Sequence, residues 1–196
     1  LMVHGIDKRV DLAPLLKKSS VAAVGPGLGQ TVWAQNLLAE LLDTAMPLVV
    51  DADALNLLAK EPFKRDNWVL TPHPGEAARL LGITIKEIES DRFSSVKALQ
   101  KKYGGVVVLK GAGTLIFDGS EMVINTTGNP GMASGGMGDV LSGVIAALLA
   151  QGLSLSQSAR FGVWLHGKAG DIAAKEGERG LLASDLLRPL RVLVNQ

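Results

Sequence analysis

Short apolar runs alternate with longer amphipathic stretches along most of the chain. Runs near 21–24, 47–50 and 68–71 are each followed by a stretch with helical periodicity, as in repeated strand–helix units. The run at 47–50 is apolar on both faces, which is typical of a strand buried inside a parallel sheet. A fourth run at 105–110 leads into two short β-like runs, 115–118 and 122–125, which Asp118-Gly119 joins as a hairpin. The pattern predicts an α/β fold with a mostly parallel sheet.

The remaining segments read as helices. We predict a short helix or turn at 10–18, one helix over Ile85–Tyr103, and two closing helices over Ser154–Lys175 and Ser184–Val194, the last capped by Ser184-Asp185. This order predicts a three-layer α/β/α domain spanning 1–196 as a single unit. Residues 1–5 read like the end of a strand, so we expect the chain to be an N-terminally truncated fragment.

Composition narrows the classes of function. With 196 residues, the chain is long enough for one domain with a sizeable core. Its net charge is +1 and it has no long single-sign run, so nucleic acid is not the expected partner. The absence of cysteine excludes disulfides and thiolate metal sites and fits a cytoplasmic protein. No apolar run is long enough to span a bilayer, so no membrane partner is expected.

The most informative segment is 125–143, a glycine-rich loop that enters an apolar run. Gly135, Gly136 and Gly138 let the backbone turn sharply and bring its N–H groups close to a ligand. At a helix N-terminus, such groups form an anion hole. Asp139 follows in the first turn, where it could act as general base for a hydroxyl that attacks a bound phosphoryl group. The plain alternative is that Asp139 only caps the helix, which would not require the glycines.

Two loops at the ends of predicted strands carry further candidates. The loop 25–30 lacks the Gly-x-Gly-x-x-Gly spacing of dinucleotide sites. Its pattern alone leaves open whether it binds a ligand or only turns the chain. Asp51 lies where parallel sheets bind ligands, so it could act through Mg²⁺ or a water. Asp53 is predicted to be the N-cap of the next helix, with Asn56 at its third position.

Two histidines and one lysine are further candidates for a functional or a core role. His73 lies between two prolines at a strand end, and this rigid position favours a functional imidazole. The His73–Glu76 spacing is too nonspecific to predict a metal site. Lys110 begins a tight turn between strands, and no P-loop motif is present. His166 is expected to be a core or groove histidine with a satisfied partner.

These motifs together resemble a known family. Gly-Gly-Met-Gly-Asp139 resembles the anion-hole motif of the ribokinase-like superfamily. The string 127–143, with Thr-Pro-His73-Pro-Gly-Glu and Lys110-Gly-Ala-Gly-Thr, closely resembles the ADP/ATP-dependent NAD(P)H-hydrate dehydratases, and the resemblance extends from Val21 onward. It implies a ribokinase-like fold and a repair reaction, in which the S form of hydrated NADH or NADPH is dehydrated at the expense of ADP, giving AMP and phosphate. Mg²⁺ is implied as a cofactor, but its ligands are unknown.

The resemblance also implies a role for each matched position. The catalytic residues would be Asp139, Gly136 and Gly138. The hydrated nicotinamide substrate would contact Gly27, His73, Pro74, Gly75, Glu76, Arg79 and Asp139. The adenine nucleotide would contact Lys110, Gly111, Ala112, Gly113, Thr114, Asn129, Gly135 and Gly138.

Two rival functions stay open. A ribokinase-like kinase for a small hydroxymethyl compound or sugar would share the Gly-Asp motif, although the His73 and Lys110 motifs argue against it. A non-catalytic nucleotide-binding module would not require Asp139. Family members often form the C-terminal half of a two-domain bacterial enzyme that also carries an NAD(P)H-hydrate epimerase, and the sequence leaves open whether one precedes this chain. The family also implies a homo-oligomer, a tetramer, and its bacterial motifs favour ADP over ATP.

Overall fold

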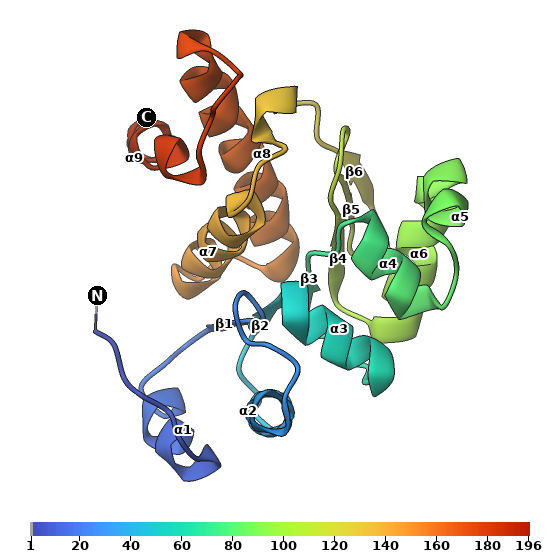
Figure 1. Cartoon of the computed structure of the whole chain (residues 1–196), viewed down its shortest axis with the longest axis vertical. Helices are drawn as coiled ribbons and strands as arrows, with labels where there is room; N and C mark the ends of the chain where they lie inside the picture. The colour runs from blue at the N-terminus through green and yellow to red at the C-terminus, as the bar shows by residue number, and fades with distance from the viewer. Residues whose placement is uncertain (1) are drawn as a thin grey trace.

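The centre of the fold is one six-stranded sheet whose strands follow one another in chain order (Figure 1). The computed structural model describes residues 2–196. Neighbouring strands from β1 to β4 run parallel, and β5 and β6 add to β4 in antiparallel fashion. The strands are β1 (Ala22–Val24), β2 (Leu48–Val50), β3 (Trp68–Leu70), β4 (Val106–Leu109), β5 (Leu115–Phe117) and β6 (Met122–Ile124). The mostly parallel sheet and its closing hairpin are confirmed.

Helices cover both faces of this sheet. Because successive parallel strands advance in one direction, right-handed crossovers place the helices between them on the same face. Figure 1 shows α3, α4 and α6 on one side of the sheet and α7 and α8 on the other, the three-layer order predicted. The helices are α1 (Arg9–Leu16), α2 (Val32–Leu42), α3 (Ala52–Lys60), α4 (Pro74–Leu81), α5 (Ile85–Ser90), α6 (Arg92–Tyr103), α7 (Met137–Ala150), α8 (Leu155–Ala173) and α9 (Leu187–Leu193), with 3-10 turns η1 (Pro130–Met132), η2 (Ala174–Glu176) and η3 (Ala183–Leu186).

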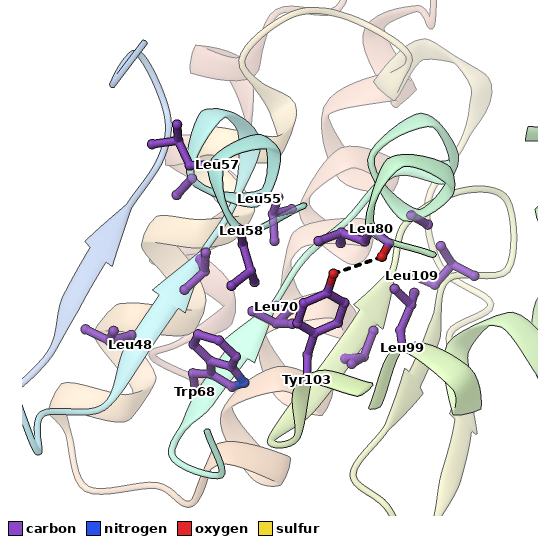
Figure 2. Close-up of a cluster of buried hydrophobic side chains, with 14 of the residues drawn as sticks. Leu48, Leu55, Leu57, Leu58, Trp68, Leu70, Leu80, Leu99, Tyr103 and Leu109 are labelled. Atoms are coloured by element: carbon purple, nitrogen blue, oxygen red, sulfur yellow. Dashed lines mark hydrogen bonds between the residues drawn. The ribbon is translucent and has the colours of Figure 1, made fainter. Parts of the chain in front are cut away.

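Alternate side chains of each strand enter two different apolar cores. Leu48 and Leu70 pack with the helices α2 to α6 (Figure 2), whereas Val49 and Val69 pack against α7 and α8. The buried Tyr103 hydroxyl donates to the Leu80 carbonyl over 2.8 Å, and burial raises the pKa of Tyr103 to about 12. Both faces of the parallel strands are therefore covered, which explains their continuous apolar runs.

Two helix boundaries differ from prediction. The single helix expected over 85–103 is broken at Asp91, which ends α5 and caps α6 by accepting a hydrogen bond from Ser94 N over 2.9 Å. The last helix does not begin at Ser184. A 3-10 turn comes first, in which Asp185 accepts from Leu182 N, and α9 then begins at Leu187.

The N-terminal segment gives a mixed result. The helix expected near 10–18 is present as α1. Leu1 lies outside the described residues, and residues 2–5 form no strand, so the strand end expected there is not seen in the described part. None of the helices between residues 2 and 196 combines the length and apolarity that crossing a bilayer requires.

Candidate active site

The carboxyl ends of β2, β3 and β4 bring three charged side chains together. Lys110, directly after β4, places its Nζ 2.7 Å from Asp51 Oδ1, directly after β2. The same ammonium lies 3.8 Å from Oε2 of Glu76, in the first turn of the helix that follows β3. Asp51 is only 1% exposed, so its negative charge requires the Lys110 ammonium as a partner. The structure thus brings the Asp51, Glu76 and Lys110 segments together at one edge of the sheet.

Asp51 joins this edge to the glycine-rich segment. Its Oδ2 accepts a hydrogen bond from the buried Ser142 Oγ of α7 over 2.8 Å, and its Oδ1 also accepts from Ala52 N over 2.9 Å. One carboxylate therefore fixes the start of α3, the Lys110 ammonium and the second turn of α7. Ser142 was not singled out from the sequence, because a serine inside an apolar helix carries no signal of so distant a partner.

The N-cap of α3 is Asp51 and not Asp53, so that prediction was wrong. Asp53 lies in the first turn of α3, and its Oδ2 accepts a hydrogen bond from Gly29 N over 2.8 Å. It thereby holds the loop 25–30 against α3. Gly25 packs so tightly that a Cβ would lie 1.7 Å from the Asp51 carbonyl oxygen, whereas Gly27 faces open space with a φ of +67°. Gly27 is therefore free to approach a ligand.

His73 and Glu76 form a reciprocal cap at the start of α4. His73 N donates to Glu76 Oε2 over 2.8 Å, and His73 Nδ1 accepts from Gly75 N over 2.9 Å. Since Nδ1 is the acceptor, the neutral imidazole carries its proton on Nε2. That atom lies 3.6 Å from Glu76 Oε1 on a half-exposed side chain. The stiff Pro72-His73-Pro74 backbone thus presents an N–H donor at the rim of the site.

Arg79, another predicted substrate residue, contacts α3 and not the Lys110 group. Its Nε donates to Asn56 Oδ1 of α3 over 2.7 Å. It lines an open hollow between α3 and α4 that Gln30, Ala59 and Lys60 complete. Arg79 therefore belongs with the loop 25–30 on the α3 side.

The first turn of α7 stands directly on the Lys110–Asp51 pair. Gly136, the N-cap, has a left-handed φ of +84°, which lets the chain enter the helix abruptly. A Cβ at Gly138 would lie 3.3 Å from Lys110 Nζ and 3.5 Å from Asp51 Oδ2. Asp139 follows in the same turn and is exposed. The segment predicted to form an anion hole is therefore a helix N-terminus beside one exposed carboxylate, and its first amides have no acceptor among residues 2–196.

Asn129 is held by α8. Its Nδ2 donates to Asp171 Oδ1 over 3.1 Å, and its Oδ1 accepts from Gly131 N over 3.1 Å. The other Asp171 oxygen accepts from Gly128 N over 3.1 Å. Both polar atoms of the Asn129 side chain are thus engaged with the protein, and contact with a nucleotide stays a prediction. Asp171 fixes this loop, and no motif in the sequence pointed to it because its partners lie more than 40 residues away.

His166 of α8 is buried near the start of α7. Burial lowers its pKa to about 4 and Lys110 adds to the effect, while a backbone hydrogen bond with Met137 opposes it. The imidazole is therefore neutral at pH 7. The expected core position is confirmed. The expected hydrogen-bond partner is missing for one ring nitrogen, because His166 Nε2 has none within residues 2–196.

Comparison with known proteins identifies the family. A family model described as NAD(P)H-hydrate dehydratase matches residues 1–191. This chain belongs to that family. The resemblance that the His73, Lys110 and Asp139 motifs indicated is thereby confirmed.

Individual relatives agree with this assignment. The bifunctional NAD(P)H-hydrate repair enzyme Nnr of Coxiella burnetii is 56% identical over 100% of this chain, which spans 40% of that protein. The ADP-dependent (S)-NAD(P)H-hydrate dehydratase of Neisseria meningitidis is 42% identical over 93% of this chain and 66% of its own length. The chain thus spans about two fifths of the bifunctional relatives that it matches.

Solved structures share the fold. The ADP/ATP-dependent NAD(P)H-hydrate dehydratase of Bacillus subtilis, crystallised with ATP and Mg²⁺ and soaked with CoA, matches with a TM-score of 0.83 and 32% identity, covering 90% of this chain and 66% of that one. A ribokinase-like superfamily protein of Enterococcus faecalis matches with a TM-score of 0.85 and 33% identity over 95% of this chain and 66% of that one. The predicted ribokinase-like fold is confirmed.

Proposed function

We propose that this chain dehydrates the S form of hydrated NADH or NADPH, using ADP and releasing AMP and phosphate. The observation that carries the proposal is the first turn of α7, seated on the Lys110–Asp51 pair with Asp139 exposed beside it. A site for a transferring phosphoryl group needs donors for its oxygens and a base for the attacking hydroxyl. This turn offers both, and the names of the relatives support the choice of substrate.

The chemistry starts with the hydroxyl of the hydrated nicotinamide ring. Asp139 accepts its proton, and the oxygen attacks the terminal phosphoryl group of ADP. An O–P bond forms to the substrate, and the O–P bond to AMP breaks. The phosphate then leaves with the ring oxygen, and loss of a proton from the adjacent ring carbon restores the double bond. His73, whose half-exposed side chain lies at the rim, would donate from Nε2 to the substrate.

The amides around Gly136 and Gly138 would stabilise the phosphoryl oxygens as charge develops on them. They are fixed before the reaction, because Ser142 on the next turn of α7 is tied to Asp51. Lys110 would supply a point charge to the nucleotide, and its pairing with Asp51 holds the ammonium in place.

Mg²⁺ is expected to accompany ADP and to neutralise part of the phosphate charge. Within residues 2–196, no group of three or more acidic, histidine or cysteine side chains could hold a metal ion by itself. This fits an ion carried mainly by phosphate oxygens, with one or two protein carboxylates. Glu76 is the carboxylate that fits best, because within residues 2–196 its Oε1 accepts no hydrogen bond, whereas both Asp51 oxygens are engaged.

The test replaces the proposed base. Asp139→Asn should abolish recovery of reduced-nicotinamide absorbance from the S-hydrate with ADP and Mg²⁺, while ADP affinity stays within about twofold, because the amides are untouched. Asp43→Asn, which changes an exposed carboxylate at the end of α2, is the matched control and should keep full activity. Full activity of Asp139→Asn would exclude Asp139 as the base.

Product analysis and nucleotide binding, measured beside the absorbance assay, separate the rival functions. A stable phosphorylated product from a small alcohol would identify a kinase. Nucleotide binding by the wild-type protein with no turnover of any hydroxyl compound would identify a binding module. Running ADP and ATP in parallel determines which nucleotide is used.

The remaining parts of the proposal concern the whole protein. We propose a cytoplasmic homo-tetramer whose polypeptide also carries an epimerase domain. The bifunctional names of the relatives support the last point. Light scattering on the full-length protein tests the tetramer, and an assay for interconversion of the R and S hydrates tests the epimerase.

A further inference from the structure

The loop that follows Lys110 is held from behind by a single side chain. Arg92, the first residue of α6, donates from Nη1 to the Ala112 carbonyl over 2.6 Å. Its Nη2 donates to the carbonyls of Leu109 and Lys110, each over 3.2 Å. One guanidinium therefore binds three carbonyl oxygens of the turn between β4 and β5.

The fourth carbonyl of this turn is also occupied. Thr114 Oγ1 donates to the Gly111 carbonyl over 3.0 Å. The Lys110 N–H donates to the Pro72 carbonyl over 2.9 Å, which ties the turn to the His73 loop. The hydrogen bonds found among residues 2–196 give no protein acceptor to the N–H groups of the next three residues, 111–113. With its carbonyls turned inward, the loop offers these N–H groups to an anionic ligand.

Gly111 is adapted to this arrangement. Its φ is +141°, and a Cβ there would lie 3.0 Å from Arg92 Nη2. A side chain would strain the backbone and push against the guanidinium. The glycine is therefore required by the approach of Arg92 as well as by the turn itself.

Arg92 differs from the other bridging arginine of this region. Arg160 pairs with the carboxylates of Asp118 and Glu121, which balance its charge. Arg92 makes no ion pair within the described residues. Lys110 is paired with Asp51, so the guanidinium is the unbalanced positive charge behind the turn.

We infer that Arg92 is a positioning residue for the adenine nucleotide: it holds the carbonyls of Leu109, Lys110 and Ala112, so that the amides of residues 111–113 face the phosphates of ADP. This inference rests on the proposed use of ADP. A lysine would retain the charge but lacks the planar fork that reaches three carbonyls at once. The conservative substitution therefore separates positioning from charge.

The experiment measures ADP binding by calorimetry in the full-length protein. Arg92→Lys should raise the Kd for ADP by about tenfold or more, since at least two hydrogen bonds of the turn are lost. In turnover, KM for ADP should rise in parallel, while KM for the hydrated nicotinamide stays within about twofold, because its side of the site is untouched. Lys97→Ala, which removes an exposed positive charge from the same helix, is the matched control and should bind ADP like the wild type.

Each outcome decides the inference. Wild-type ADP affinity in Arg92→Lys would overturn it, as would an equal loss in Lys97→Ala. Equal increases in both KM values with a lowered Tm would indicate general damage and would also overturn it. Arg92→Ala adds the loss of charge, but the lysine variant carries the test where alanine fails to fold. If the wild type binds ADP in an Arg92-dependent manner but dehydrates nothing, the inference stands and the proposed reaction is wrong.

Discussion

Replacing Lys110 with methionine should destabilise the protein strongly, although the side chain lies at the edge of the site. The substitution retains length and apolar stem but removes the ammonium 2.7 Å from Asp51 Oδ1. Asp51 is 1% exposed and cannot recover the lost partner from bulk water. Its carboxylate would be left with Ser142 Oγ and Ala52 N as donors.

The magnitude follows from the burial of the two partners. Removing one member of a fully buried pair costs about 3–5 kcal/mol. The Lys110 side chain is 19% exposed, so water reaches the vacated position and the loss falls below this range. We expect the free energy of unfolding to fall by about 2–3 kcal/mol. For a chain of this length, that corresponds to a Tm lowered by about 4–12 °C.

Chemical and thermal unfolding of Lys110→Met, Asp51→Asn, the double variant and one control measure this effect. Lys101→Met, on the exposed side of α6, is the matched control and should change stability by less than about 0.5 kcal/mol. Asp51→Asn combined with Lys110→Met removes both charges and should recover about 1–2 kcal/mol relative to Lys110→Met alone. A loss below about 0.5 kcal/mol in Lys110→Met would refute the reasoning. So would a double variant that is less stable than the sum of the single changes predicts.

Two further predictions concern the start of α7. Burial lowers the pKa of His166 from 6.5 to about 4, so the unfolded chain binds the proton more readily between these values, and stability present above pH 6.5 is lost as pH falls toward 4. His166→Leu should remove up to about 3 kcal/mol of that pH dependence. A variant whose free energy of unfolding falls as much between pH 6.5 and pH 4 as that of the wild type would contradict this. Gly136→Ala should cost about 1–2 kcal/mol, because φ is +84° and the new Cβ would lie 3.2 Å from Ala183 Cβ. Gly135→Ala, whose Cβ would meet nothing within 4 Å, is its control in the same denaturation experiment, and equal losses would show that backbone strain at 136 is not the cause.

Much of the fold could be predicted because the parallel strands are buried on both faces. The runs ending at Val50, Leu70 and Leu109 are apolar throughout, and glycine, proline or aspartate follows closely. The break at Asp91 also had a signal. Thr84 and Glu87 form a capping box, and Asp91 stands three residues before Ser94 as a second cap. A polar face that continues through both helices concealed the break.

The contacts that organise the site could not be predicted in the same way. Asp51 and Lys110 are 59 residues apart, and Asp51 and Ser142 are 91 apart. Asp51 and Asp53 both stood at plausible cap spacing, and the structure shows that Asp51 is the cap, whereas Asp53 accepts a hydrogen bond from Gly29 N. Glycine and proline motifs show where a backbone must turn. They do not show which distant side chain holds the turn.

The arrangement of charges explains why the nucleotide site needs more than its lysine. The Lys110 ammonium is balanced by Asp51, and Glu76 and Asp139 add negative charge close to the position proposed for the phosphates. ADP would therefore meet a site whose side chains do not by themselves offset its charge. The compensation must come from the unpaired amides of α7 and of the turn held by Arg92, together with the Mg²⁺ ion expected to travel with the nucleotide. Backbone donors keep their direction and cannot be titrated, so a site built on them retains its donors while Asp139 gains and loses a proton.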